Sequence, residues 1–91
     1  MRIVWSTQAL GDRDAIWEFI ASDDIFAAMR ADTDFANAVE DLAEYPELGK
    51  PGLVSGTREL FPVHNYRIVY EVNGQEVWIL AIVHTSRLWP E

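Results

Sequence analysis

The side chains in this sequence that are best suited to chemistry are four cations and one histidine, all in the second half of the chain. They are Lys50, Arg58, Arg67, His84 and Arg87. Arginine stays protonated, so it can hold negative charge but cannot accept a proton. Histidine has an ordinary pKa near neutrality and can act as an acid or a base. The set therefore predicts a cationic site with one acid–base group beside it.

Each of these residues also has an ordinary structural interpretation, and the sequence leaves both interpretations open. In the apolar run YRIVYEV, Arg67 fits a solvated strand residue that lays its stem over a neighbouring valine. Arg58 fits an ion pair with a nearby glutamate, and His84 fits a structural histidine at the end of a strand. Lys50, between a glycine and a proline, fits an exposed surface lysine.

Other kinds of site lack their characteristic residues. The chain has no cysteine, which excludes disulfides and thiolate chemistry. His64 and His84 do not have the H-x-x-x-H or H-E-x-x-H spacing of metal sites. No glycine-rich phosphate loop and no G-x-S-x-G motif occurs. We therefore expect no metal centre and no cofactor.

Composition and charge favour one small domain. The 91 residues are 49% hydrophobic, which is enough for a single core, so we expect one domain over residues 1–91. The longest apolar run, VWILAIV (77–83), is too short to cross a bilayer, and we expect a cytoplasmic protein that contacts no membrane. Residues 1–49 contain eleven Asp or Glu and three Arg, whereas residues 50–91 contain four acidic and four basic residues. A cationic site is therefore expected only in the second half.

The first half has the pattern of a strand followed by two helices. RIVW (2–5) is a short apolar run that ends at Ser6 and Thr7, residue types that commonly cap helix N-termini. Apolar residues then recur every three or four positions over 10–20 and again over 25–43. SDD (22–24) supplies the second cap between them. We expect these helices to form an antiparallel hairpin.

The second half has the pattern of three strands. Residues 45–56 contain two prolines and three glycines and are expected to form a loop. TRELFPV (57–63) is expected to be a strand in which Pro62 marks an edge or a bulge. Two apolar runs then flank Asn73-Gly74, a strong signal for a hairpin with a type I′ turn. The expected fold is α+β: an N-terminal strand, an antiparallel helical hairpin and a three-stranded antiparallel meander.

A two-residue turn at Asn73-Gly74 fixes an expected register for this hairpin. It places Tyr70 opposite Val77 on the face that meets the helices, and it places Arg67 and Trp78 on the other face. One helical hairpin covers only one face of a sheet. We therefore expect Arg67 and Trp78 to line an open concavity on the uncovered face.

Five motifs together resemble the RelE/ParE superfamily of bacterial toxins from type II toxin–antitoxin modules. They are ALGDRDAIWEFIA, AVEDLAEYPELGKPG, GTREL, YRIVYEV and VWILAIVHTSRLWP. The resemblance spans about residues 3–90 and implies the same order of elements. It also implies a growth inhibitor that a cognate antitoxin neutralises, in a higher-order hetero-oligomeric complex. Members of the superfamily act in two ways: RelE-like toxins cut mRNA on the ribosome, and ParE-like toxins poison DNA gyrase without a nuclease site.

The leading hypothesis from this resemblance is a ribosome-dependent mRNA endonuclease. Cleavage through the 2′-OH requires a base, cations for the charge that builds on the phosphate, and an acid for the leaving oxygen. The resemblance assigns the catalytic roles to Arg67 and Arg58 at the phosphate and to His84 as base or acid. It makes Lys50 and Arg87 auxiliary cations that bind the substrate.

Several departures weigh against a nuclease, and gyrase poisoning is the alternative hypothesis. The lysine-rich loop of RelE-type nucleases is reduced to Lys50, and no tyrosine follows Arg87, where such enzymes often have one. Trp89 can stack on a base as a substrate-binding residue, but it cannot transfer a proton. A net charge of −8 opposes docking on ribosomal RNA, where contacts to phosphates set affinity. The sequence leaves the ribosome and gyrase both open as targets.

Overall fold

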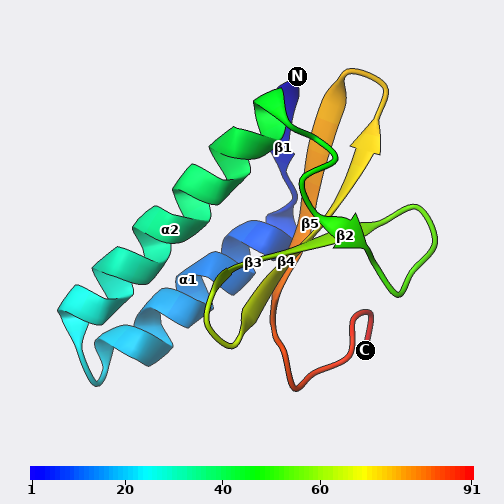
Figure 1. Cartoon of the computed structure of the whole chain (residues 1–91). Coiled ribbons are helices and arrows are strands. Elements are labelled where there is room, and N and C mark those ends of the chain that lie inside the picture. Colours follow the sequence, from blue (N-terminus) through cyan, green and yellow to red (C-terminus); the bar gives the residue numbers. More distant parts are fainter.

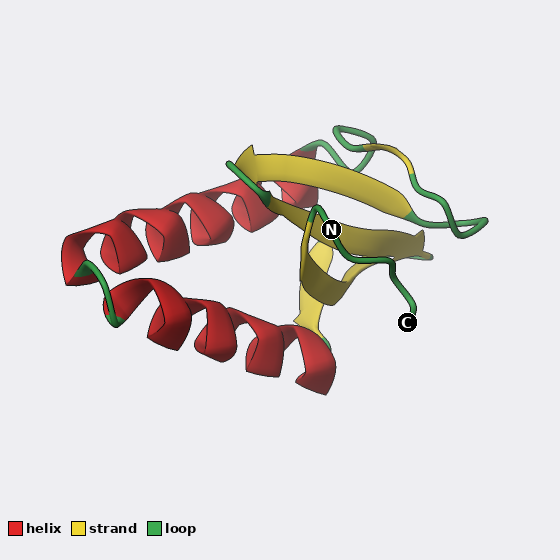
Figure 2. Ribbon diagram, turned by 90° about the horizontal axis from the view of Figure 1, so that it is seen from below, coloured by secondary structure: helices red, strands yellow, loops and turns green.

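The computed structural model describes all residues, 1–91, as two helices and a five-stranded sheet (Figure 1). The elements in chain order are β1 (Arg2–Trp5), α1 (Thr7–Ala21), α2 (Ile25–Glu44), β2 (Lys50–Pro51), β3 (Arg58–Val63), β4 (Tyr66–Asn73) and β5 (Glu76–His84). The two helices lie together on one side of the sheet, so that the domain has two layers (Figure 2). Neither helix has the length and apolar character needed to cross a membrane.

Both helices begin at the caps that the sequence predicts. The Ser6 side chain accepts a hydrogen bond from the Ala9 amide, and the Asp24 side chain accepts from the amides of Phe26 and Ala27. Each cap satisfies amide groups that have no partner inside the helix. The link between the helices is only residues 22–24, which makes them antiparallel neighbours as expected.

The sheet is larger and more mixed than the expected meander. Its strand order is β1-β5-β4-β3-β2, with β1 parallel to β5 and the other pairs antiparallel. The α+β class and the β3-β4-β5 meander are confirmed, but β1 joins the same sheet beside β5. The prediction that residues 45–56 form only a loop was wrong at Lys50–Pro51, which pairs with Arg58 and Glu59 as the edge strand β2.

The β4–β5 hairpin turns one residue later than the sequence predicts. Asn73 pairs with Glu76, so the turn residues are Gly74 and Gln75. Gly74 has a positive φ of 62° and Gln75 does not, which is the pattern of a type II′ turn rather than type I′. Tyr70 consequently faces Ile79 instead of Val77.

Two bulges bend the central strands. In β5, Tyr70 pairs with Ile79 and Val69 with Ala81, which leaves Leu80 as an extra residue. This bulge reverses the side-chain alternation along β5, so that Ile82 joins the core cluster and Ala81 does not. In β3, the register shifts between Leu60 and Val63, which confirms the expected bulge at Pro62.

The core lies between the two helices and one face of the sheet. Its largest fully buried side chains from this interface are Phe35, Leu42, Ile68, Tyr70, Val77 and Ile79. Tyr70 also holds the segment that follows α2 against the sheet. Its hydroxyl donates to the Pro46 carbonyl and accepts from the Gly49 amide, both at 2.8 Å. Burial raises the pKa of Tyr70, so the hydroxyl keeps its proton and can make both bonds.

Candidate functional site

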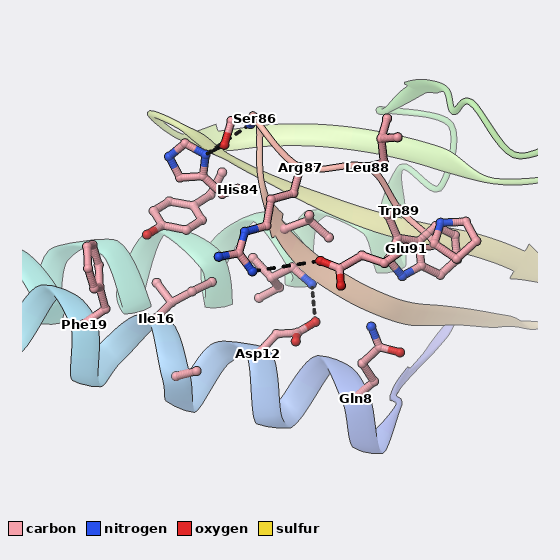
Figure 3. Close-up of a pocket in the computed structure, with 15 residues that line it drawn as sticks. Gln8, Asp12, Ile16, Phe19, His84, Ser86, Arg87, Leu88, Trp89 and Glu91 are labelled. Carbon is pink, nitrogen blue, oxygen red and sulfur yellow. Dashed lines mark hydrogen bonds and ion pairs between the residues drawn. The ribbon is translucent and has the colours of Figure 1, made fainter.

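A groove of about 670 Å³ lies between α1 and the last residues of the chain. We call residues 85–91 the C-terminal segment. In Figure 3, α1 runs along one side of the groove and the C-terminal segment lies on the other, with the end of β5 between them. The volume is within the range of ligand-binding pockets. The groove is therefore the candidate functional site.

Eight of the fifteen residues that line the groove are hydrophobic, and some of these side chains are exposed. Phe19 on α1 is 73% exposed, and Leu88 on the C-terminal segment is 71% exposed. Ile16, Tyr66 and Trp89 also line the groove. Exposed apolar side chains around a concavity are typical of a surface that binds another molecule.

Asp12 provides the acidic group of the α1 wall. Its Oδ2 accepts a hydrogen bond of 3.0 Å from the Ile82 amide, because β1 ends at Trp5 and leaves this part of the β5 edge without a neighbouring strand. Burial raises the pKa of Asp12, and the hydrogen bond from Ile82 opposes the rise.

His84 lines the groove as the last residue of β5. Its Nδ1 accepts the Ser86 amide at 3.1 Å and lies 2.7 Å from the Ser86 hydroxyl. Its ring packs edge-on against Tyr66, with 5.4 Å between the ring centroids. Because Nδ1 accepts the amide proton, the proton of the neutral ring belongs on Nε2.

Two further residues of the predicted site, Arg87 and Trp89, also line the groove from the C-terminal segment. The Arg87 side chain is mostly exposed, and its Nη1 lies 3.9 Å from Glu91 Oε1. An exposed pair at this distance contributes little to stability, so the Arg87 guanidinium remains available to another partner.

Arg67 lies elsewhere, on the face of the sheet that points away from the helices. Its neighbours Tyr66 and Ile68 both pack toward the helices, so alternation along β4 turns Arg67 to the opposite face. There it is only 6% exposed, with its Nε 3.8 Å from Glu59 Oε1. Its Nη2 donates to the Arg87 carbonyl at 2.8 Å.

The expected open concavity around Arg67 and Trp78 was therefore wrong. Val69 and Ala81, which share this face with Arg67, are fully buried. Arg67 itself is buried on this face, between Glu59 and the Arg87 carbonyl of the C-terminal segment. The groove lies instead beside β5 and α1, where neither Arg67 nor Trp78 lines it.

Arg58 and Lys50 are engaged locally and also lie outside the groove. Arg58 Nη1 donates to the Gly49 carbonyl at 2.7 Å, which ties β3 to the segment before β2. Lys50 places its Nζ 4.8 Å from the centre of the Phe61 ring, a cation–π contact. The six predicted residues thus divide, with His84, Arg87 and Trp89 at the groove and the other three elsewhere.

The prediction from sequence missed the α1 side of the groove. Asp12, Ile16 and Phe19 recur at spacings of four and three, which places them on one face of α1. That spacing was a usable signal, although Ile16 and Phe19 are equally typical of a core stripe. Only the position of the C-terminal segment beside α1 identifies these residues as part of a groove and not of the core.

Comparison with known proteins agrees with this architecture. Residues 3–89 match the family model described as "ParE toxin of type II toxin-antitoxin system, parDE". The chain is 40% identical over 91 residues to a candidate toxin of Sinorhizobium fredii, Y4kP, covering 99% of this chain and 94% of the relative. It is also 40% identical over 88 residues to the toxin RelE2 of Caulobacter vibrioides, covering 96% and 98% of the two chains.

Solved structures show the same fold. A chain of the chromosomal ParDE toxin–antitoxin system from P. aeruginosa matches with a TM-score of 0.79 and 27% identity, over 92% of this chain and 95% of that one. The YoeB/ParE toxin from Agrobacterium tumefaciens matches with a TM-score of 0.65 and 18% identity, over 92% and 98%. The chain therefore belongs to the ParE toxin family of type II toxin–antitoxin systems.

Proposed function

We propose that this protein is the toxin of a type II toxin–antitoxin module and inhibits growth by acting on DNA gyrase without cutting RNA. Family membership supports the role of a toxin. The placement of the cationic residues favours gyrase poisoning over the ribosome-dependent endonuclease.

The observation behind this choice is the separation of Arg67 from His84. A nuclease must bring a base, an acid and cations to one phosphate within hydrogen-bond reach. Arg67 is enclosed beside Glu59 on one face of the sheet, whereas His84 packs against Tyr66 on the other. Arg58 lies outside the groove that His84 lines, with its Nη1 bound to the Gly49 carbonyl, so it does not complete a cluster with His84.

The groove supports a toxin that acts by binding a protein. Its exposed side chains Phe19 and Leu88 suit contact with a protein surface better than contact with a phosphate. The gyrase hypothesis from the sequence likewise gives more weight to aromatic side chains and the helical hairpin than to a cationic cleft.

The second partner in this proposal is a cognate antitoxin. The acidic residues of the chain are concentrated in residues 1–49, which include both helices. Charge complementarity then calls for an antitoxin segment that is basic or apolar where it contacts the helices. A short neighbouring reading frame that encodes such a segment is the expected genetic context.

Parallel assays of the purified toxin separate the two targets. One assay follows supercoiling and DNA breakage by gyrase, and the other follows mRNA on programmed ribosomes, each with and without the cognate antitoxin. We expect gyrase inhibition that the antitoxin reverses, and intact mRNA. Cleaved mRNA with unaffected gyrase would establish the nuclease hypothesis instead, and growth arrest with neither effect would point to another target.

A further inference from the structure

The C-terminal segment forms one wall of the groove but has few contacts to the rest of the chain. The Thr85 amide donates to the Asn65 carbonyl at 2.8 Å, and the Arg87 amide donates to the His84 carbonyl at 3.0 Å. Residues 88–91 make no hydrogen bond to the body of the domain. Arg87 is therefore the last residue of the segment that is anchored to the sheet.

A buried side chain provides the tertiary half of that anchor. Arg67 Nη2 donates to the Arg87 carbonyl at 2.8 Å across twenty residues of sequence. The guanidinium is enclosed with the carboxylate of Glu59, which is itself only 8% exposed. A charged donor makes a stronger hydrogen bond than a neutral one, and the more so away from water.

The surroundings of Arg67 indicate that it is fixed in place and not poised for a ligand. Burial of an arginine is costly unless a counter-ion and hydrogen bonds compensate for it. Glu59 supplies the counter-ion, and the Arg87 carbonyl supplies the hydrogen bond to Nη2, while Nε has no hydrogen-bond partner. The one strong bond that Arg67 makes is thus directed at the C-terminal segment.

We infer that Arg67 is a positioning residue: held by Glu59, it fixes the C-terminal segment as the second wall of the groove. Arg67 then affects binding at the groove through that segment, without touching the bound partner. The link to growth inhibition rests on the proposed function, but the anchoring of the segment does not.

Trypsin provides a direct measurement, because Arg87 is itself a cleavage site. The carbonyl that Arg67 holds belongs to the Arg87–Leu88 peptide bond, which the protease must bind in an extended, released form. Substituting Arg67→Met alone leaves Glu59 buried and unpaired, so the double variant E59Q/R67M is the one to test. We expect it to lose residues 88–91 about tenfold faster than the wild type, since cleavage follows the population of the released form.

The cleavage pattern distinguishes local release from general instability. Global unfolding would accelerate cleavage at Arg13 and Arg30 in the two helices as well, whereas release of the segment accelerates cleavage at Arg87 alone. Arg58→Met is the matched control, since Arg58 makes a similar bond to a carbonyl elsewhere in the domain. Equal rates at Arg87 in the wild type and in E59Q/R67M, with folding verified by circular dichroism, would overturn the inference.

Growth inhibition tests the second half of the inference. If Arg67 acts only through the C-terminal segment, E59Q/R67M cannot lose more activity than a chain that ends at Ser86. A measurable loss that does not exceed that of the truncated chain, at matched expression, supports the inference, whereas unchanged activity or a larger loss overturns it. If the wild type does not inhibit growth, the proposed function fails. The trypsin experiment still decides whether Arg67 anchors the C-terminal segment.

Discussion

Arg67 and His84 occupy adjacent rungs of the β4–β5 ladder yet project from opposite faces of the sheet. His84 pairs with Tyr66, and Arg67 pairs with Val83. Because successive side chains alternate, no small movement of either residue can bring both to one phosphate. A shared catalytic site for the two would require a different β4–β5 register.

We therefore predict that His84→Gln retains growth inhibition within about threefold, whereas loss of a general base costs roughly a hundredfold or more. The measurement is the inducer level needed to halve the growth rate, normalised to the amount of toxin. His64→Gln, the exposed histidine outside the groove, is the control. A hundredfold loss confined to His84→Gln would restore the acid–base hypothesis.

Tyr70→Phe should destabilise the fold by about 1–3 kcal/mol, because it removes the hydroxyl and leaves the Gly49 amide buried without a partner. For a domain of this size, 1 kcal/mol shifts the melting temperature by roughly 4–8 °C. Tyr45→Phe is the matched control, since Tyr45 is exposed. Equal melting temperatures for the wild type and Tyr70→Phe would show that the two bonds add nothing.

Two glycine-to-alanine substitutions should have opposite effects on the stability of the domain. A Cβ at Gly49 would lie 2.8 Å from the Glu59 carbonyl oxygen and from the Tyr70 ring, so Gly49→Ala should cost about 1–3 kcal/mol. A Cβ at Gly11, inside α1, meets nothing within 4 Å. Gly11→Ala should therefore stabilise the protein by about 0.5–1 kcal/mol, through lower chain entropy in the unfolded state. Urea unfolding of both variants checks the pair.

Asp12 should make the stability of the domain depend on pH. Burial raises its pKa above the ordinary 3.8, so the fold favours the protonated carboxyl. That contribution is fully present below pH 3.8 and is lost as the pH rises through the raised value. Asp12→Asn does not ionise, so its stability relative to the wild type should increase from pH 3.5 to pH 7, as urea unfolding would measure.

The control for this effect is Asp14→Asn, which changes the net charge equally at an exposed position of the same helix. Between pH 3.5 and pH 7, the stability of Asp12→Asn relative to the wild type should increase more than that of Asp14→Asn. Asp12→Ala should be less stable than Asp12→Asn at both pH values, because it removes the acceptor of the Ile82 amide. The prediction is contradicted if the wild type becomes more stable relative to Asp12→Asn as the pH rises.

The elements of this protein follow from local sequence signals. The caps at Ser6 and Asp24, the helical spacing of apolar residues, the proline bulge and the central hairpin each depend on residues close together in the chain. Steric and hydrogen-bonding preferences of neighbours determine these features. The family motifs could likewise be recognised in the sequence.

Only the tertiary structure decided where the functional side chains lie. One residue of difference in the turn and one extra residue at Leu80 set which side chains of β5 meet the core. The burial of Arg67 depends on Glu59 in the neighbouring strand β3 and on the Arg87 carbonyl, which is twenty residues away in sequence. The groove exists because residues 85–91 fold beside α1. Such contacts join distant parts of the chain, so spacing in the sequence could place Arg67 in a strand but could not place it in a site.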